Sequence, residues 1–259
     1  MRIAVGVIAL LIFSGCSGEK PRVAELRICA VSSAAVCILN QLQCAPAAVD
    51  EYSLPFAAKG TPLVGKGAVL SAERMLELEI NCVIIWEYQR SAAAHLARRG
   101  IKIFEIKSLR LKELPELMLR LGKLTGKERE SAVLAAEFRK KLGKPDPQAA
   151  SRRVYLELYS RNRGAGKNSY SGDLLAAAGA ESIFEKTSLV SSEEIIRRDP
   201  EIIFYVENCG SAEEIMKRPG MNKVSAVKNK KVFPVPRRFL VEGAAPVEGI
   251  EYFKKRISG

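Results

Sequence analysis

ERMLELEINCVIIW, residues 73–86, is repeated in pattern 120 residues later as EEIIRRDPEIIFY, residues 193–205. Each copy predicts a short helix that begins on a glutamate, followed by a tight turn and a fully apolar strand. A repeat of this size predicts two similar α/β lobes. Because ligands favour clefts between domains, the repeat indicates a two-lobed binding protein.

The rest of the chain supports this division into lobes. Apolar strand segments alternate with helices of about ten residues, which predicts parallel sheets flanked by helices. Strands are expected at 27–31, 47–49, 82–86, 101–106, 153–158, 201–206 and 231–235. Between the halves, residues 127–142 predict a long amphipathic helix, and Gly122 interrupts the helical pattern before it. We therefore expect an N-terminal lobe over 22–125, a connecting helix over 126–144 and a C-terminal lobe over 151–259.

The N-terminus predicts export. Met1-Arg2 is followed by an apolar run over 3–13 and then by Ser14-Gly15-Cys16, so residues 1–16 are predicted to be a secretory signal peptide. The run is shorter than the ~20 apolar residues that a membrane-spanning helix needs. A cysteine after Ser-Gly resembles a bacterial lipobox, although Phe13 stands where leucine is usual. An ordinary signal with an incidental cysteine is the alternative. A lipidated Cys16 would anchor the exported domain to the cell membrane, facing the periplasm or the cell exterior.

The net charge of +12 points to an anionic ligand, an anionic membrane surface or nucleic acid as a partner. Basic and acidic residues are interspersed, and no helix-turn-helix, zinc finger or aromatic-basic module is present in the sequence. An exported protein also seldom meets nucleic acid, so we expect none as a partner. Hydrophobic residues make up 47% of the chain, which suffices for two cores.

Parallel α/β sheets bind ligands beyond the carboxyl ends of their strands, which selects the loops that follow each strand. In the first half these loops hold Ser32, Ser33, Tyr52, Lys66, Trp86, Tyr88 and Arg90. In the second half they hold Tyr159, Arg161, Arg163, Lys167, Tyr170, Glu207, Asn208, Arg237 and Arg238. From these we predict a ligand-binding set of Ser33, Tyr52, Lys66, Trp86, Tyr88, Tyr159, Arg161, Arg163, Asn208 and Arg237.

Two kinds of side chain in this set suggest the chemistry of the ligand. Trp86, the only tryptophan, ends an apolar strand and can offer a flat aromatic contact; packing in the lobe core is the alternative. Arg161 and Arg163 crowd a glycine-containing loop, where they could pair with carboxylates or with an anionic chelate. The alternative for that loop is a solvated basic turn. We expect a bulky and at least partly anionic ligand.

No catalytic motif is present in the sequence. It has no Gly-x-Ser-x-Gly elbow, no His-Glu-x-x-His and no pair of histidines for acid–base work. Residues 164–169 resemble a phosphate loop but lack its first glycine and its Lys-Ser/Thr pair. His95 is the sole histidine, which disfavours a site for a free zinc or manganese ion. An exported α/β enzyme that acts on an anionic small molecule is the alternative to a binding protein.

The order and spacing of several segments resemble a known family. They lie at 27–43, 70–86, 99–104, 122–126, 153–159, 173–184, 190–203 and 226–236, and the strings LLAAAGAESIF at 174–184 and SAVKNKKV at 225–232 are particularly typical. Over nearly the whole mature chain, the sequence resembles the class III substrate-binding proteins of ABC importers, which bind cobalamin, ferric siderophores or haem.

This resemblance implies two Rossmann-like α/β lobes joined by a single long rigid α-helix. It implies a metal-chelate held in the cleft between the lobes, with no further cofactor and no metal site of the protein's own. The protein would act as a monomer that delivers the chelate to an ABC permease, which a separate ATPase subunit serves.

The resemblance also implies roles for single residues. Family members dock onto the permease through one glutamate on each lobe, and the matching positions are Glu73 and Glu193. The alternative role for these acids is in a capping box. Trp86 matches one of the tryptophans that line the cleft of cobalamin-binding members, whereas the companion aromatic residue of the loop at 65–67 is missing.

Overall fold

The computed structural model describes residues 25–142 and 152–258. The signal peptide predicted at 1–16 and its Cys16 lie outside these residues, as do the last two residues of the connecting helix predicted at 126–144. Within the described ranges, no helix combines the length and the apolar character that crossing a membrane requires.

Lobe one is built around a four-stranded parallel sheet with the strand order β2-β1-β5-β6. Its elements are β1 (Ile28–Ala30), α1 (Ser33–Gln41), β2 (Ala48–Val49), η1 (Leu54–Phe56), β3 (Gly65–Lys66), β4 (Val69–Leu70), α2 (Ala72–Glu77), β5 (Cys82–Trp86), η2 (Glu87–Gln89), α3 (Arg90–Ala97), β6 (Lys102–Ile106), η3 (Leu111–Glu113), α4 (Leu114–Thr125) and α5 (Glu128–Leu142). Because β1 lies between β2 and β5, the loops after β1 and β5 meet at the switch point of the sheet.

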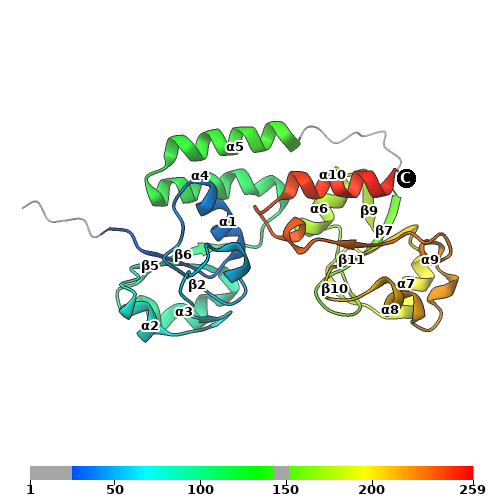
Figure 1. Cartoon of the computed structure of the whole chain (residues 1–259), viewed down its shortest axis with the longest axis horizontal. Helices are drawn as coiled ribbons and strands as arrows, with labels where there is room; N and C mark the ends of the chain where they lie inside the picture. The colour runs from blue at the N-terminus through cyan, green and yellow to red at the C-terminus, as the bar shows by residue number, and fades with distance from the viewer. Residues whose placement is uncertain (1–24, 143–151, 259) are drawn as a thin grey trace, which may run out of the picture.

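Lobe two centres on β7, β11 and β12, which run parallel, while β9 pairs with the start of β7 and the short β8 and β10 add antiparallel. Its elements are β7 (Arg152–Glu157), β8 (Arg163–Gly164), α6 (Tyr170–Ala177), β9 (Ala180–Ser182), β10 (Ser188–Leu189), α7 (Ser192–Arg198), β11 (Ile202–Val206), α8 (Ala212–Lys217), η4 (Met221–Lys223), α9 (Ser225–Lys228), β12 (Val232–Val235), η5 (Arg237–Leu240) and α10 (Pro246–Ile257). In Figure 1, α4, α5 and α10 lie along the top of the molecule, and α2, α3, α7 and α8 lie along the bottom. The two α/β lobes of the predicted fold class are therefore confirmed.

The repeated pattern folds as predicted, because α2 and α7 begin in the same way. Each helix is capped by a serine hydroxyl that accepts a hydrogen bond from the backbone N–H three residues later. Ser71 accepts from Arg74 and Ser191 from Glu194, both at 3.1 Å. A tight turn then leads each helix into a buried strand, β5 or β11. Each lobe thus contains the same helix–turn–strand unit.

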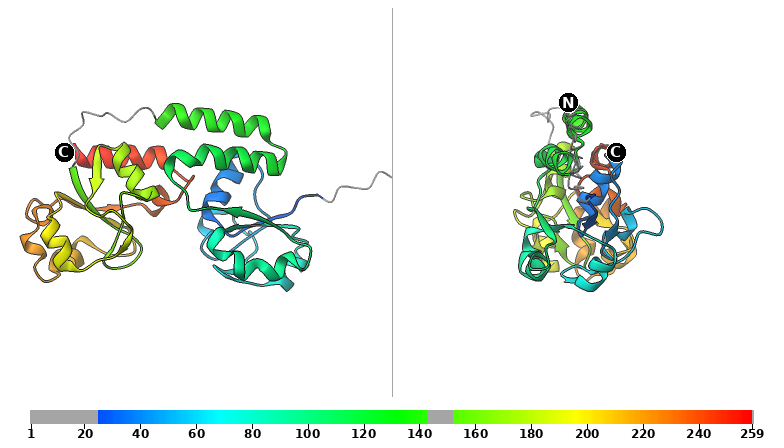
Figure 2. Two further views of the ribbon diagram at one scale, coloured as in Figure 1. Left: turned by 180° about the vertical axis from the view of Figure 1, so that it is seen from behind. Right: turned by 90° about the vertical axis from the view of Figure 1, so that its left-hand side faces the viewer.

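The helical stretch between the sheets differs from the expectation at one point. Gly122 lies inside α4 rather than interrupting it, and the break falls at Gly126, whose φ of 69° ends the helix. α4 and α5 form an antiparallel hairpin along the top of lobe one (Figures 1 and 2). A Cβ atom at Gly122 would lie 1.9 Å from Ser131 Oγ, so glycine allows the two helices to approach closely. A rigid helical connection between the lobes stays a prediction, because the residues that follow α5 lie outside the described ranges.

Gly122→Ala is expected to destabilise the fold by about 1–3 kcal/mol, because the new methyl group overlaps Ser131 close to the turn of the hairpin. Chemical denaturation of the purified protein measures the change in the free energy of unfolding. Adding Ser131→Gly removes the overlapping atoms, and the double variant is expected to recover part of the loss. Equal stability of Gly122→Ala and the parent would show that the helices can move apart without cost.

Two segments hold the lobes against each other. Arg110, just before η3, donates from Nε to Asp173 Oδ2 in α6 at 2.7 Å. From lobe two, the segment 241–245 reaches back to α1, where Gln41 Nε2 donates to Gly243 O at 3.0 Å. One cluster of buried hydrophobic side chains accordingly spans both lobes.

Candidate functional site

A cavity of about 450 Å³ between the lobes brings together six of the ten predicted ligand-binding residues. These are Ser33, Tyr52, Trp86, Tyr88, Tyr159 and Arg237. The rest of the lining consists of Val31, Asp50, Ser53, Gly67, Ala68, Gln89, Val241 and Glu242. Most of these residues follow β1, β2, β5, β7 or β12, as expected for a site at the carboxyl ends of strands. We call this space the aromatic cavity.

Trp86 and Tyr88 form a stacked aromatic pair in the wall of lobe one. Their ring centroids lie 6.5 Å apart and their planes are 10° from parallel. Trp86 is half-buried at the end of β5, and its backbone N–H donates to Gln89 Oε1 at 2.9 Å, which fixes the turn into η2. Because Tyr88 is 77% exposed, the pair can offer aromatic surface to a ligand.

Asp50 organises the loop after β2. Its carboxylate is buried and accepts hydrogen bonds from Ser53 N (3.0 Å) and Gly67 N (3.3 Å). Nearby, Ser33 Oγ donates to Tyr52 O at 3.3 Å. Burial raises the pKa of Asp50, and the hydrogen bonds oppose that rise. Asp50 was not among the predicted residues, although it follows β2 directly, which is the signal that selected Tyr52.

Tyr159 and Arg237 form the wall of lobe two. The guanidinium carbon of Arg237 lies 5.6 Å from the centroid of the Tyr159 ring, a cation–π arrangement. The surrounding protein, and to a lesser extent the negative charge of Glu242, raise the pKa of Tyr159 to about 12. Tyr159 is therefore neutral at physiological pH and can donate a hydrogen bond.

A second cavity, of about 510 Å³, shares Tyr159 and Glu242 with the first. Its other lining residues are mostly polar, namely Ser108, Leu109, Arg110, Leu158, Asn168, Ser169, Tyr170, Ser171, Lys186, Thr187 and Leu240. We call this space the polar cavity. Glu242 was not predicted from the sequence, because it lies between η5 and α10 in a segment without a periodic pattern.

Four predicted residues lie outside the lining of the aromatic cavity, and three of them are at its edge or on the surface. Lys66 lies at the edge, with Nζ 3.1 Å from Glu51 and 5.6 Å from the centroid of the Tyr52 ring. Arg163 is exposed on β8, and Asn208 is exposed in the turn after β11, where its φ is 63°. All three residues were selected because they lie in loops that follow predicted strands, but none of them lines the cavity.

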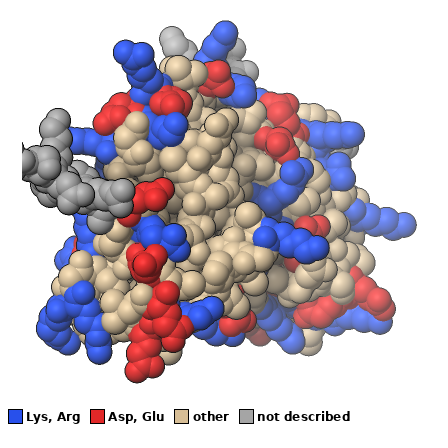
Figure 3. All heavy atoms as spheres, turned by 60° about the vertical axis from the view of Figure 1, so that its left-hand side comes forward, with Lys and Arg blue, Asp and Glu red and all other residues tan. Residues whose placement is uncertain are grey.

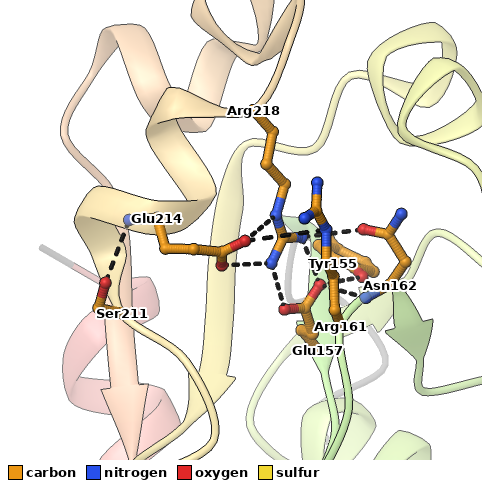
Figure 4. A network of polar contacts seen from close by, with 7 residues as sticks. All are labelled: Tyr155, Glu157, Arg161, Asn162, Ser211, Glu214 and Arg218. Carbon is orange, nitrogen blue, oxygen red and sulfur yellow. Dashed lines mark hydrogen bonds and ion pairs between the residues drawn. The ribbon is translucent and has the colours of Figure 1, made fainter.

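Arg161 belongs instead to a polar network behind the wall of lobe two (Figure 4), where its Nε lies 3.8 Å from Glu214. The centre of the network is the buried ion pair of Arg218 and Glu157, joined by hydrogen bonds of 2.6 and 2.7 Å. Asn162 N also donates to Glu157 at 2.9 Å. The network therefore fixes the turn after β7, which carries the cavity tyrosine.

Glu73 and Glu193 lie exposed in the first turns of α2 and α7. Each is the second residue of its helix, so neither holds the third position at which a capping-box acid stands. Figure 1 shows α2 and α7 at the bottom of different lobes, opposite α5 and α10. The two helices that carry these glutamates in their first turns thus lie on the same side of the molecule.

Charges of both signs are interspersed on the protein surface. On the face that Figure 3 displays, Lys and Arg alternate with Asp and Glu around a largely uncharged central area. Within residues 25–142 and 152–258, no group of three or more His, Cys, Asp or Glu is placed to hold a metal ion. His95 Nδ1 lies 2.7 Å from Ala92 O inside α3, away from both cavities.

Comparisons with known proteins agree with this architecture. A family model described as periplasmic binding protein matches residues 28–238. A haem-binding periplasmic protein of Roseiflexus is 18% identical, with a TM-score of 0.78 over 90% of this chain and 99% of that one. A vitamin B12-binding periplasmic protein of Vibrio cholerae is 21% identical, with a TM-score of 0.76 over 90% and 96%. A possible iron-binding protein of Staphylococcus epidermidis is 23% identical, with a TM-score of 0.73 over 90% and 98%. No curated protein sequence matches the chain.

Proposed function

The chain belongs to the periplasmic binding protein family, and on this premise we propose that it captures a metal-chelate outside the cytoplasm and delivers it to an ABC permease. The chelate is a ferric siderophore, a cobalamin or other corrinoid, or haem. Binding is non-covalent, and a separate ATPase subunit of the permease supplies the energy of transport.

The aromatic cavity is the observation that carries this proposal. It lies between the lobes, and its wall combines four aromatic residues with acidic, hydroxyl and guanidinium groups. Both cavities fall within the ~300–1,000 Å³ that small-molecule sites typically occupy. The names of three similar structures, which refer to haem, vitamin B12 and iron, support a ligand of this class. Because family members bind solutes, binding is favoured over the alternative of an exported enzyme.

The lipid anchor at Cys16 and the docking role of Glu73 and Glu193 are part of the same proposal. An anchored, monomeric protein would stay close to the permease without spanning the membrane. The exposed glutamates at the starts of α2 and α7 suit contact with basic residues of a partner, because a helix N-terminus stabilises a carboxylate.

Trp86→Ala is expected to weaken chelate binding by about 1–3 kcal/mol, because it removes the aromatic surface next to Tyr88. Isothermal titration calorimetry with haemin, cyanocobalamin and ferric siderophores measures the change in Kd. Trp86→Phe keeps an aromatic ring and is expected to retain most of the affinity. Unchanged binding by Trp86→Ala would place the indole in the lobe core only.

A further inference from the structure

Tyr159 and Glu242 stand where the aromatic cavity and the polar cavity meet, since both residues line both spaces. A ligand too large for one cavity would extend into the other and pass these two side chains. They are therefore the residues most suited to contact the middle of a bulky ligand.

In the described part of the chain, the carboxylate of Glu242 is held by its own backbone and by no hydrogen bond or ion pair from another residue. The two arginines that share a cavity with Glu242 have other contacts. Arg110 pairs with Asp173, and the guanidinium carbon of Arg237 lies 5.6 Å from the centroid of the Tyr159 ring. Glu242 keeps some contact with solvent because it faces the cavities, yet the surrounding protein raises its pKa. Burying a carboxylate without a countercharge costs free energy, and a positively charged group of a ligand would offset that cost.

A second polar side chain beside Glu242 is poorly satisfied. The hydroxyl of Tyr170 is buried and lines the polar cavity, and in the described part of the chain it makes no hydrogen bond of good geometry, although the backbone of Gly243 approaches it. Burial is the main cause that raises the pKa of Tyr170, Tyr159 and Cys37. The negative charge of Glu242 is the second cause for all three. A carboxylate without a cationic partner and a poorly satisfied hydroxyl therefore lie close together at the junction of the cavities.

The fold holds Glu242 firmly in this place. The next residue, Gly243, has a φ of 77°, and a Cβ atom there would lie 3.1 Å from Ile38 Cγ1 in α1. Gln41 of the same helix donates to Gly243 O at 3.0 Å. The segment that carries Glu242 is thus fixed against lobe one, although it belongs to lobe two.

We propose that Glu242 binds a positively charged centre of the ligand, and that the ligand extends past it into both cavities. This inference rests on the proposed function and narrows its ligand to chelates with a positive centre. The rings of Tyr52, Trp86 and Tyr88 fit such a ligand, because aromatic faces attract cations. The two arginines that suggested an anionic ligand, Arg161 and Arg163, do not line the aromatic cavity, and the arginine that does line it, Arg237, lies over the ring of Tyr159.

Matched probes that differ by one positive charge, at the metal or on a side chain of the chelate, test this proposal. Suitable pairs are aquocobalamin with cyanocobalamin, and gallium(III) with zinc(II) protoporphyrin IX. Ferrioxamine B, which carries an ammonium group, and its neutral N-acetyl derivative form a third pair. Calorimetry with the processed protein compares the parent with Glu242→Gln. Glu248→Gln is the control, since Glu248 is exposed, pairs with Arg238 and lines neither cavity.

The parent and Glu248→Gln are expected to bind the more positive member of a pair at least ~10-fold more tightly, and Glu242→Gln is expected to lose that preference. Thermal unfolding of Glu242→Gln should show no loss of stability, because a carboxyl whose pKa is raised on folding destabilises the folded state above its unfolded pKa. Binding of a chelate without a charge preference, or with a preference that survives in Glu242→Gln, overturns this inference alone. Binding of no chelate from any pair overturns the proposed function and the inference with it.

Discussion

Charge reversal at both Glu73 and Glu193 is expected to abolish ligand uptake by cells while leaving the Kd for the ligand unchanged. Both glutamates are exposed in the first turns of helices that lie on the same side of the molecule, and neither lines the aromatic or the polar cavity. The family resemblance implies basic residues on the permease at these contacts. Lysine in place of each glutamate would repel them and weaken the association of the two proteins. Uptake of labelled chelate by cells and calorimetry of the purified protein measure the two quantities.

The control for this variant reverses the charge of two other exposed acidic residues, one in a helix at the top of each lobe. Glu137 in α5 and Glu251 in α10 are exposed and lie opposite α2 and α7. The double reversal of Glu137 and Glu251 changes the net charge by the same amount and is expected to leave uptake intact. Normal uptake with both Glu73 and Glu193 reversed would remove the docking assignment.

Arg218→Met is expected to destabilise the protein by about 3–5 kcal/mol, because it leaves the Glu157 carboxylate buried without a countercharge. Side-chain exposures of 2% for Arg218 and 3% for Glu157 show that water cannot replace the lost partner. Chemical denaturation measures the free energy of unfolding. The variant should also weaken ligand binding, because Glu157 fixes the turn that carries Tyr159 through Asn162 (Figure 4).

The double variant Glu157→Leu with Arg218→Met separates charge burial from packing. It removes both charges, so it is expected to be more stable than Arg218→Met alone. A double variant that is less stable than either single variant would show that the ion pair stabilises the fold more than apolar side chains in its place.

The sequence predicted the scaffold well where the pattern is local. The serine caps, the short helices and the apolar strands of the repeat are determined by neighbouring residues, and α2–β5 and α7–β11 formed as expected. The end of α4 was predicted less well, because the reason that Gly122 is tolerated in a helix is the close approach of Ser131 from α5. A contact between two helices cannot be recognised from the residues on either side of one glycine.

In the site as well, positions set by the local sequence were predicted and positions set by contacts between distant segments were not. Ser33, Trp86 and Tyr159 reached the aromatic cavity because each lies at the end of a strand or just beyond it, a position that the pattern reveals. Arg161 satisfies the same rule but lies beside Glu214, more than fifty residues later in the chain. Glu242 depends on the path of a segment without regular structure across the lobe boundary. Neither arrangement has a local signature.

The fluorescence of Trp86, the only tryptophan, offers the most direct test of capture between the lobes. The processed protein is titrated with haemin, cyanocobalamin and a panel of ferric siderophores, with correction for light absorbed by the ligand. We expect saturable quenching by one chelate class and the same Kd from calorimetry, because the indole lines the aromatic cavity. Binding of none of these chelates by either method would contradict the proposal that this protein captures a metal-chelate.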